Sequence, residues 1–212
     1  MTDEMSISAF TEALGSGAPT PGGGAASALV GALGAALAEM VARFTVGRKS
    51  YAAVEPQAQD IVQRAAQARV ELLALVAADE QAFQQVSAAY KMNKGTDDER
   101  EQREVAIQTS LAAAMEPPTH ALRLSMSVVS LAYDIAAIGN ATVLTDAACA
   151  AIVGESAARA AAINILANFA LLKDTAAGEQ ALQAARSTLS DAARLRDETL
   201  AIVYRRMNVA GL

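Results

Sequence analysis

Asp79 is the residue whose position in the sequence most strongly suggests chemistry. It falls within an apolar stripe of helical spacing, three residues after Val76 and four residues before Phe83, on a face that is expected to pack against a core. A carboxylate on such a face is costly to bury unless it is paired, and burial raises its pKa towards the range in which a general acid or base works best. A salt bridge or a different helix register explains the pattern equally well, so a catalytic and a structural role both stay open.

Three consecutive glycines, Gly22–Gly24, follow Pro21 at the expected start of a helix. The free N–H groups of a helix N-terminus can bind an anion. The glycines do not form a phosphate-binding loop, because no Gly-Lys-Ser/Thr follows, nor a dinucleotide-binding motif, because no strand precedes them. A tight turn that lets another group approach the backbone closely is the plainer interpretation.

Asn164 and Asn168 lie four residues apart in a stretch that is otherwise mostly Ala, Ile and Leu, so they share one face of a helix. Buried amide groups need hydrogen-bond partners. The pair therefore indicates either a polar network between helices or a ligand pocket.

The remaining polar candidates have ordinary structural explanations. Arg48 and Lys49 follow a helix end, where the helix dipole favours cations, although a substrate with carboxylates would also need such groups. Asn140 is typical of the position after a helix, and Asp146 of the first turn of one. The single histidine and the single cysteine leave no zinc site built from nitrogen and sulfur ligands, so we expect no metal.

Residues that favour helices dominate the chain that must position these groups. Hydrophobic residues make up 53% of the 212 residues but aromatic residues only 4%, and Ala and Leu lose least on entering a helix. Caps, glycines and prolines predict helices at about residues 6–14, 25–45, 56–90, 96–115, 119–138, 145–172 and 179–207, with an extended link at 141–144. The sequence therefore predicts a single all-α domain over residues 1–212, an up-and-down bundle of long antiparallel helices.

Charge and hydropathy narrow the possible partners. The net charge of −6 and the isoelectric point near 4.9 argue against nucleic acid. The uncharged stretch Ala25–Ala38 is expected to be too short for a membrane span, and no targeting signal opens the chain. We therefore expect a cytoplasmic protein that binds neither nucleic acid nor membranes.

Several motifs together resemble the cyclodeaminase/cyclohydrolase family of folate enzymes. The resemblance is carried by Ala18–Ala26 (APTPGGGAA), by Thr45–Tyr51 (TVGRKSY) and by Asp79–Phe83 (DEQAF). It continues through Lys94-Gly95-Thr96, Pro118, Gly139-Asn140, Thr145-Asp146, Asn164, Asn168 and Asp174. The chain departs from the family pattern at Ala25 and Thr145, where serine is usual. The resemblance spans nearly the whole chain in the right order.

This resemblance assigns roles to the candidates. It implies that Asp79 is the catalytic base and that Asn140, Asp146, Asn164 and Asn168 line the pocket. We further expect the backbone of Pro21, Gly22, Gly23 and Gly24 to contact the ligand, and Arg48 and Lys49 to bind the carboxylates of a glutamate tail. No cofactor beyond the tetrahydrofolate substrate is expected.

The resemblance leaves two reactions open. We expect a methenyltetrahydrofolate cyclohydrolase, which opens the bridge between N5 and N10 with water. The length of the chain and the residues of the glycine motif are closer to that branch of the family. The alternatives are a formimidoyltetrahydrofolate cyclodeaminase, which closes the bridge and releases ammonia, and a non-enzymatic helical module that binds a partner. The small side chains of the 25–45 helix also suggest a homodimer.

Overall fold

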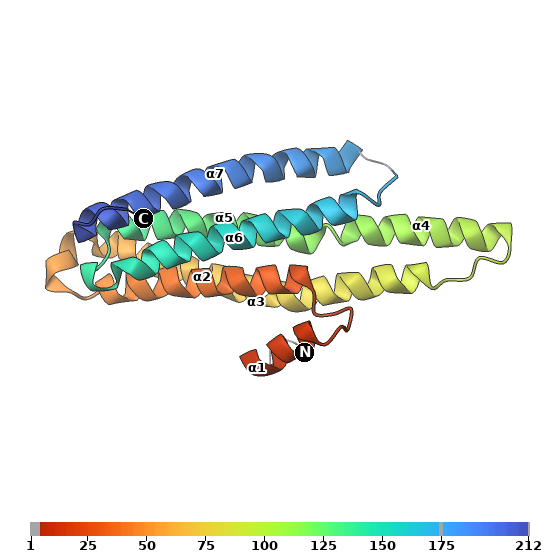
Figure 1. The fold of residues 1–212 in the computed structure, drawn as a ribbon, viewed down its shortest axis with the longest axis horizontal. Coiled ribbons are helices and arrows are strands. Elements are labelled where there is room, and N and C mark those ends of the chain that lie inside the picture. The colour runs from red at the N-terminus through yellow and green to blue at the C-terminus, as the bar shows by residue number, and fades with distance from the viewer. Residues whose placement is uncertain (1–4, 174–175, 212) are drawn as a thin grey trace.

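The computed structural model describes residues 5–173 and 176–211, and within them every regular element is helical (Figure 1). The all-α prediction is confirmed. Asp174, which belongs to the resemblance, lies outside the described residues. The α-helices are α1 (Ile7–Gly15), α2 (Gly23–Thr45), α3 (Glu55–Tyr90), α4 (Asp97–Ala113), α5 (Glu116–Ile138), α6 (Leu144–Phe169) and α7 (Ala176–Met207). Two short 3-10 helices, η2 (Lys49–Val54) and η3 (Ala141–Val143), complete the described elements.

The long helices lie along one axis and alternate in direction as the sequence predicts, except that α4 and α5 run in the same direction (Figure 1). Helices α4 and α5 follow one another end to end and together form one rod, antiparallel to α3. The far part of α3 and the whole of α4 extend beyond the other helices as a two-helix arm, whereas α1 lies to one side of the bundle. The pocket described below lies where this arm leaves the bundle.

The structure corrects the sequence prediction at α5 and at the link that follows it, and confirms it at the start of α4. Helix α5 begins at Glu116 rather than Thr119, because its two prolines fall in the first turn, where no backbone N–H is needed. The link at residues 141–144 is a 3-10 turn and not extended, because the Asn140 side chain accepts a hydrogen bond from the Thr142 N–H at 3.0 Å. The capping box predicted at Thr96 is present and starts α4.

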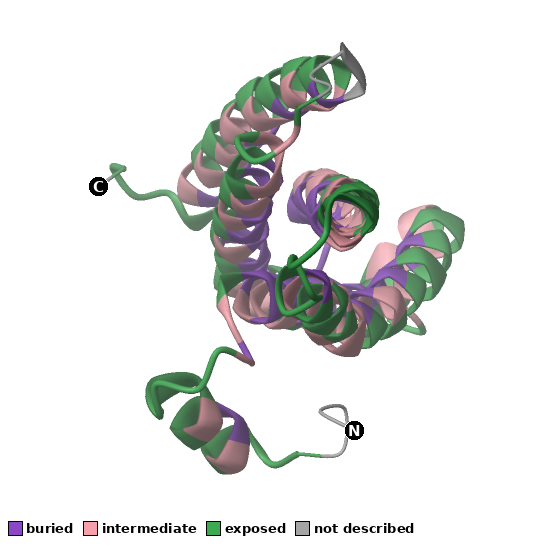
Figure 2. Ribbon diagram, turned by 90° about the vertical axis from the view of Figure 1, so that its right-hand side faces the viewer, coloured by how far each residue is buried: buried purple, intermediate pink, exposed green. Residues whose placement is uncertain are grey.

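Small residues allow the central helices to pack closely. A Cβ atom added at Gly34 of α2 would lie 3.0 Å from Val153 of α6, and one at Gly154 would lie 3.1 Å from Val129 of α5. The core around these contacts consists largely of alanines, with Leu72, Leu131 and Ile135 among its largest fully buried side chains. The burial pattern in Figure 2 follows this arrangement, with the buried stripes turned towards the bundle axis.

The apolar helices are long as well as buried. By length and composition alone, the stretches Gly23–Thr45, Asp97–Ile138 and Ala141–Phe169 are each sufficient to cross a membrane. The expectation that the second helix is too short for this is wrong, since it counted only the uncharged stretch and α2 has 23 residues. Between 44% and 61% of the apolar windows are buried inside the bundle, so the helices bury much of this apolar surface against each other.

Candidate functional site

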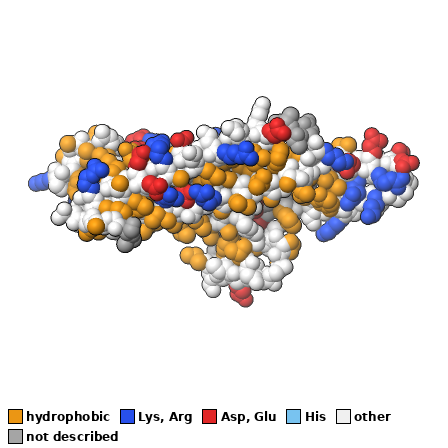
Figure 3. All heavy atoms as spheres, turned by 45° about the horizontal axis from the view of Figure 1, so that its top comes forward, with side chains coloured by type: hydrophobic (Ala, Val, Ile, Leu, Met, Phe, Trp, Pro, Cys, Tyr) orange, Lys and Arg blue, Asp and Glu red, His pale blue; other side chains and the backbone are white. Residues whose placement is uncertain are grey.

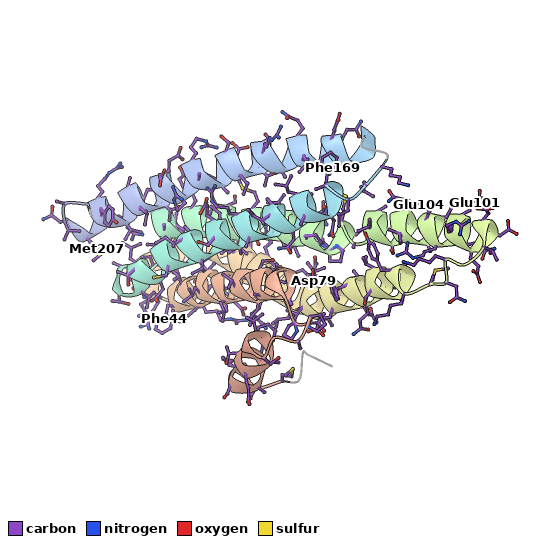
Figure 4. The ribbon with its side chains drawn as sticks, turned by 45° about the vertical axis from the view of Figure 1, so that its right-hand side comes forward. Phe44, Asp79, Glu101, Glu104, Phe169 and Met207 are labelled. Carbon is purple, nitrogen blue, oxygen red and sulfur yellow. The ribbon has the colours of Figure 1, made fainter. Side chains whose placement is uncertain are left out.

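Asp79 lies on α3 at the level where α2 begins (Figure 4). The apolar stripe that contains Asp79 packs into the core only on the N-terminal side of this residue, where Leu72 and Val76 are buried. Beyond Asp79, Phe83 and Tyr90 are 43% and 44% exposed and line a cavity instead. The expectation of a continuous core-facing stripe is therefore wrong beyond Asp79, because there α3 has left α2 behind and borders the pocket.

The Asp79 carboxylate lies against the first turn of α2. Its Oδ2 accepts a hydrogen bond from the Ala25 N–H at 3.0 Å. A Cβ atom added at Gly24 would lie 2.0 Å from Asp79 Oδ1, so only glycine leaves room for the carboxylate. The N-cap residue Gly22 has no side chain to cap the helix, and Asp79 satisfies one of the N–H groups that a helix start leaves free.

Burial raises the pKa of Asp79 above its ordinary value, the Ala25 N–H lowers it in part, and the neighbouring Glu80 charge raises it further. Among the residues that the structure describes, no Lys, Arg or His forms an ion pair with Asp79. The salt bridge that the sequence left open is therefore not found there. The carboxylate is half-buried, polarised by a helix start and reachable from the pocket, which suits it to exchange a proton with a bound molecule.

The pocket beside Asp79 has a volume of about 590 Å³, within the usual range for small-molecule sites. Its walls come from the turn before α2, from the first residues of α2, and from α3, α4 and α6. The lining residues are Pro19, Thr20, Gly22, Gly23, Gly24, Asp79, Ala82, Phe83, Val86, Ser87, Tyr90, Leu111, Ala114, Asn164, Asn168 and Leu171. Apolar and aromatic walls with a few polar groups are typical of sites that bind small organic molecules.

Asn164 and Asn168 both reach this pocket from α6. The Asn164 amide lies beside Gly23, where an added Cβ atom would be 3.7 Å from Nδ2. Each amide also donates to the backbone, Asn164 to the Ala160 carbonyl and Asn168 to the Ala114 carbonyl, both at 2.9 Å. The two interpretations left open from the sequence, an interhelical link and a pocket wall, thus hold together for Asn168.

The other predicted site residues lie at the opposite end of the bundle within this chain. Asn140 bonds to the last turn of α2, because its N–H donates to Thr45 Oγ1 at 2.9 Å and its side chain to the Phe44 carbonyl at 2.9 Å. Twenty residues of helix separate this point from Gly24, or about 30 Å at 1.5 Å per residue. Arg48 and Lys49 follow the end of α2, and Asp146 lies in the first turn of α6.

One chain alone therefore brings together only part of the predicted set. Asp79, Gly22–Gly24, Asn164 and Asn168 share one pocket, and Pro21 is buried between the lining residues Thr20 and Gly22 in the chain without lining the pocket itself. Arg48, Lys49, Asn140 and Asp146 do not line it. Spacing along one helix cannot reveal this division, since it depends on where a separate helix begins and ends.

Several pocket residues were not predicted from the sequence, notably Thr20, Phe83, Ser87 and Tyr90. The last three follow Asp79 by four, eight and eleven residues, so they lie on its face of α3. That spacing contains the signal, but it has the same form as a core stripe. In the described part of the chain, no three His, Cys, Asp or Glu side chains lie close enough together to hold a metal ion.

The helical bundle and its carboxylate pocket define an all-helical protein with a site for a small organic ligand. The chain belongs to the formiminotransferase-cyclodeaminase family, whose model matches residues 6–187. It is 35% identical over 208 residues to a protein of Methylorubrum extorquens named methenyltetrahydrofolate cyclohydrolase, a match that covers 98% of this chain and 100% of that protein.

This chain also matches a longer protein and a solved structure. The chain is 33% identical over 192 residues to the formimidoyltransferase-cyclodeaminase of Rattus norvegicus, covering 89% of this chain and 35% of that protein. It thus spans about a third of the length of that relative. The crystal structure of a formiminotetrahydrofolate cyclodeaminase from Thermotoga maritima is 28% identical and superposes with a TM-score of 0.79 over 98% of both chains.

Proposed function

We propose that this protein is a methenyltetrahydrofolate cyclohydrolase with Asp79 as its general base. The observation that carries the proposal is the Asp79 carboxylate itself, which has a raised pKa, a single hydrogen bond to Ala25 and direct access to a folate-sized pocket. The full-length similarity to a protein of that name supports the choice of reaction.

The proposed chemistry follows from the charge of the substrate. The methenyl bridge between N5 and N10 is an amidinium cation, so an adjacent carboxylate favours its binding. Water adds to the bridge carbon while Asp79 accepts one of its protons, which forms a tetrahedral carbinolamine. The carbinolamine hydroxyl then loses its proton as the C=O bond forms and the bond from that carbon to N5 breaks, and N5 takes up one proton. Of the two protons of the water, one thus ends on N5 and the other is released, so that the products are 10-formyltetrahydrofolate and one free proton.

The first turn of α2 fixes the base in this proposal. The Ala25 N–H holds Oδ2 and leaves Oδ1 as the oxygen that receives the proton. The missing side chain at Gly24 lets the carboxylate approach the helix start, and the exposed Gly23 backbone borders the pocket. A positioned base of this kind contributes about 10²–10⁴-fold to the rate.

The Asp79→Asn variant tests the proposal, followed by the loss of the near-ultraviolet absorbance of methenyltetrahydrofolate. We expect a fall in kcat of about 10²–10⁴-fold with the circular dichroism spectrum unchanged. Asp134→Asn is the matched control, because burial also raises the pKa of Asp134 but this residue lies in a different hollow, with Arg64. Equal turnover of Asp79→Asn and the wild type would remove Asp79 from the mechanism.

Formimidoyltetrahydrofolate cyclodeaminase is the second candidate, and the likeness to the Thermotoga maritima cyclodeaminase favours it. Both reactions pass through a tetrahedral carbon held between the same two nitrogens, so one base can serve either. Turnover of the formimidoyl substrate with release of ammonia, and none of the methenyl substrate, would assign the protein to this reaction. If the protein binds no reduced folate at all, the remaining alternative is a non-enzymatic helical module that binds a partner.

We also propose that the protein is a homodimer built on the outer face of α2. The half-buried and exposed apolar residues of this face recur at alternating spacings of four and three, namely Ala26, Val30, Leu33, Leu37, Met40 and Phe44. This is the spacing of a coiled-coil seam. Leu33 is 52% exposed in the single chain, and Figure 3 shows hydrophobic side chains gathered along one side of the molecule.

Such a dimer would explain why the predicted site residues lie at two ends of one chain. Two copies of α2 packed antiparallel about a two-fold axis meet at the centre of the seam, between Leu33 and Leu37. In that register Gly22 of one copy faces Arg48 of the other. Arg48 and Lys49 of the partner would then supply cations for the carboxylates of a folate tail. Asn140 and Asp146 of the partner, which lie at the same end of the bundle, would be brought to the same pocket.

Sedimentation and subunit mixing test the dimer. Leu33→Glu should yield monomers, whereas Val105→Glu should not, because Val105 is 61% exposed on α4 and lies off the seam. Mixed Asp79→Asn and Arg48→Ala subunits should regain about a quarter of wild-type activity, since half of the random dimers are hybrids with one intact site of two. No recovery in mixtures of two impaired variants would contradict a shared site.

The remaining expectations form part of the same proposal. We infer that the enzyme acts in the cytoplasm on a soluble reduced folate, without a metal or a further cofactor, and without binding nucleic acid or a membrane. The net charge of −6 supports the exclusion of nucleic acid. Sedimentation of the purified protein with anionic lipid vesicles tests the membrane part, and co-sedimentation would overturn it.

A further inference from the structure

The two asparagines of α6 offer the pocket the same kind of atom. A backbone carbonyl can only accept a hydrogen bond, so Nδ2 must be the atom that faces Ala160 in one case and Ala114 in the other. This fixes which amide atom is oxygen. None of the residues that the structure describes donates to Oδ1 of Asn164 or of Asn168, so both oxygens keep their lone pairs for a ligand.

Together with the Asp79 carboxylate, these oxygens form a series of hydrogen-bond acceptors along the pocket. Asn164 lies beside Gly23, next to the Gly24 site where the Asp79 carboxylate packs. Asn168 lies one turn further along α6, about 6 Å away at 1.5 Å per residue. A carboxylate that only accepts and two amide oxygens make this part of the pocket rich in acceptors. The group that binds along it must carry donors.

We propose that Asn164 and Asn168 accept hydrogen bonds from the N–H groups of the pterin ring and so place the bridge carbon at Asp79. This inference rests on the proposed folate substrate. A tetrahydropterin carries its bridge nitrogen on one ring and its 2-amino and N3–H donors at the far end of the other. With the bridge at Asp79, the ring extends along α6 and its donor edge reaches the second asparagine.

If Asn164 and Asn168 bind the pterin ring in this way, they determine which ligands bind as well as where the ligand lies. A site built to receive a ligand N–H discriminates against analogues without it, because its own polar atom is then left unpaired. Asn168 also links α6 to the end of α4 through Ala114, so a simple loss of binding in a variant would not separate the two roles.

Paired ligands and paired variants separate them. The probes are two 5,8-dideazafolate inhibitors that differ only in a 2-amino or a 2-methyl substituent, and their Kd values are measured by calorimetry. The wild type should bind the amino compound about tenfold more tightly. Asn168→Ala should bind both alike, whereas Asn168→Asp should keep the preference, because it retains an acceptor while losing the bond to Ala114.

Controls distinguish the possible failures. Asn93→Ala, in the loop between α3 and α4 and outside the pocket, should discriminate as the wild type does. Equal binding of the two inhibitors by a wild type that still turns over methenyltetrahydrofolate would overturn this inference and leave the proposed function intact. A wild type that binds neither inhibitor nor substrate would overturn the proposed function as well. Loss of the preference in Asn168→Asp as well as in Asn168→Ala would assign Asn168 to the link with Ala114 alone.

Discussion

Helix α2 holds a carboxylate near each of its ends, and it holds them in opposite ways. At its start, Asp79 has one hydrogen bond from a backbone N–H, and burial raises its pKa. Towards its end, the buried Glu39 carboxylate receives hydrogen bonds from Arg43 at 2.8 Å and from Arg69 at 3.1 Å. Burial raises the pKa of Glu39, but these two guanidinium groups outweigh it and the pKa is lowered. A carboxylate that stabilises the fold is thus given cations, whereas the proposed catalytic one is left a proton acceptor.

The two ends of the bundle differ in the same way in how their polar groups are used. At the far end of the bundle, polar groups bond to the chain itself: Tyr51 Oη accepts from the Ala141 N–H, and Arg206 donates to the carbonyls of Ala136 and Gly139. At the pocket end, two asparagine oxygens have no donor among the described residues. Unused hydrogen-bonding capacity, and not polarity alone, marks the site.

After removal of the Asp79 charge itself, the largest effect should follow from closing the space beside Asp79. In Gly24→Ala the new Cβ atom would lie 2.0 Å from Oδ1, so the carboxylate must move. A displacement of about 1 Å costs about 100-fold in rate, and we expect a fall in kcat/KM of that order. Gly34→Ala is the control: its Cβ atom would meet Val153 at 3.0 Å in the middle of the bundle, so stability should change and turnover should not. Normal turnover of Gly24→Ala would mean that Asp79 is not held in its working position by the turn.

Titration of Asp79 should appear in the pH dependence of the rate. A general base must be ionised, so kcat/KM should fall tenfold per pH unit below the pKa of Asp79 in the free enzyme. Because burial raises that pKa above the ordinary 3.8, this fall in kcat/KM, the acid limb of the pH profile, should begin at a higher pH than for an exposed aspartate. Glu39→Gln should leave the position of this limb unchanged. A limb at the ordinary value, or one that moves in Glu39→Gln, would contradict the contrast between the two ends.

The sequence was sufficient for the helices but only partly for the site. Caps and prolines placed each helix within a few residues, because these signals act within one turn, as Thr96 and Glu99 do at the start of α4. The chemistry of Asp79 was visible as a carboxylate in an apolar stripe. That Phe83 and Tyr90 face a cavity, and that Asn140 lies about 30 Å from Gly24, depends on which helices pass which. Residue spacing within one helix does not contain that information.

A smaller effect is expected where Glu39 loses a cation. Arg69→Met removes one charged hydrogen bond from a buried carboxylate, which we expect to cost about 1–2 kcal/mol at neutral pH, at the low end because Arg69 is 36% exposed. The lowered pKa of Glu39 means that its contribution is present above the unfolded value of about 4.5 and is lost as pH falls through the folded value. Urea unfolding should therefore show a gap between variant and wild type that narrows in acid. A gap that stays constant would assign the loss to packing of the Arg69 side chain.

The smallest effect, and the one that separates the two roles of Asp79, is on stability. Because the native pKa of Asp79 is raised, the folded chain binds this proton more tightly than the unfolded chain. Stability is then lost as pH rises from the ordinary 3.8 through the raised pKa, which is the opposite sign to Glu39. Asp79→Asn removes this loss and still offers an oxygen to the Ala25 N–H, so its stability relative to the wild type should increase between pH 4 and pH 7 in urea unfolding. A relative stability that decreases over this interval would mean that the ionised carboxylate serves chiefly to cap α2, and Asp79 would then resemble Glu39 as a structural group.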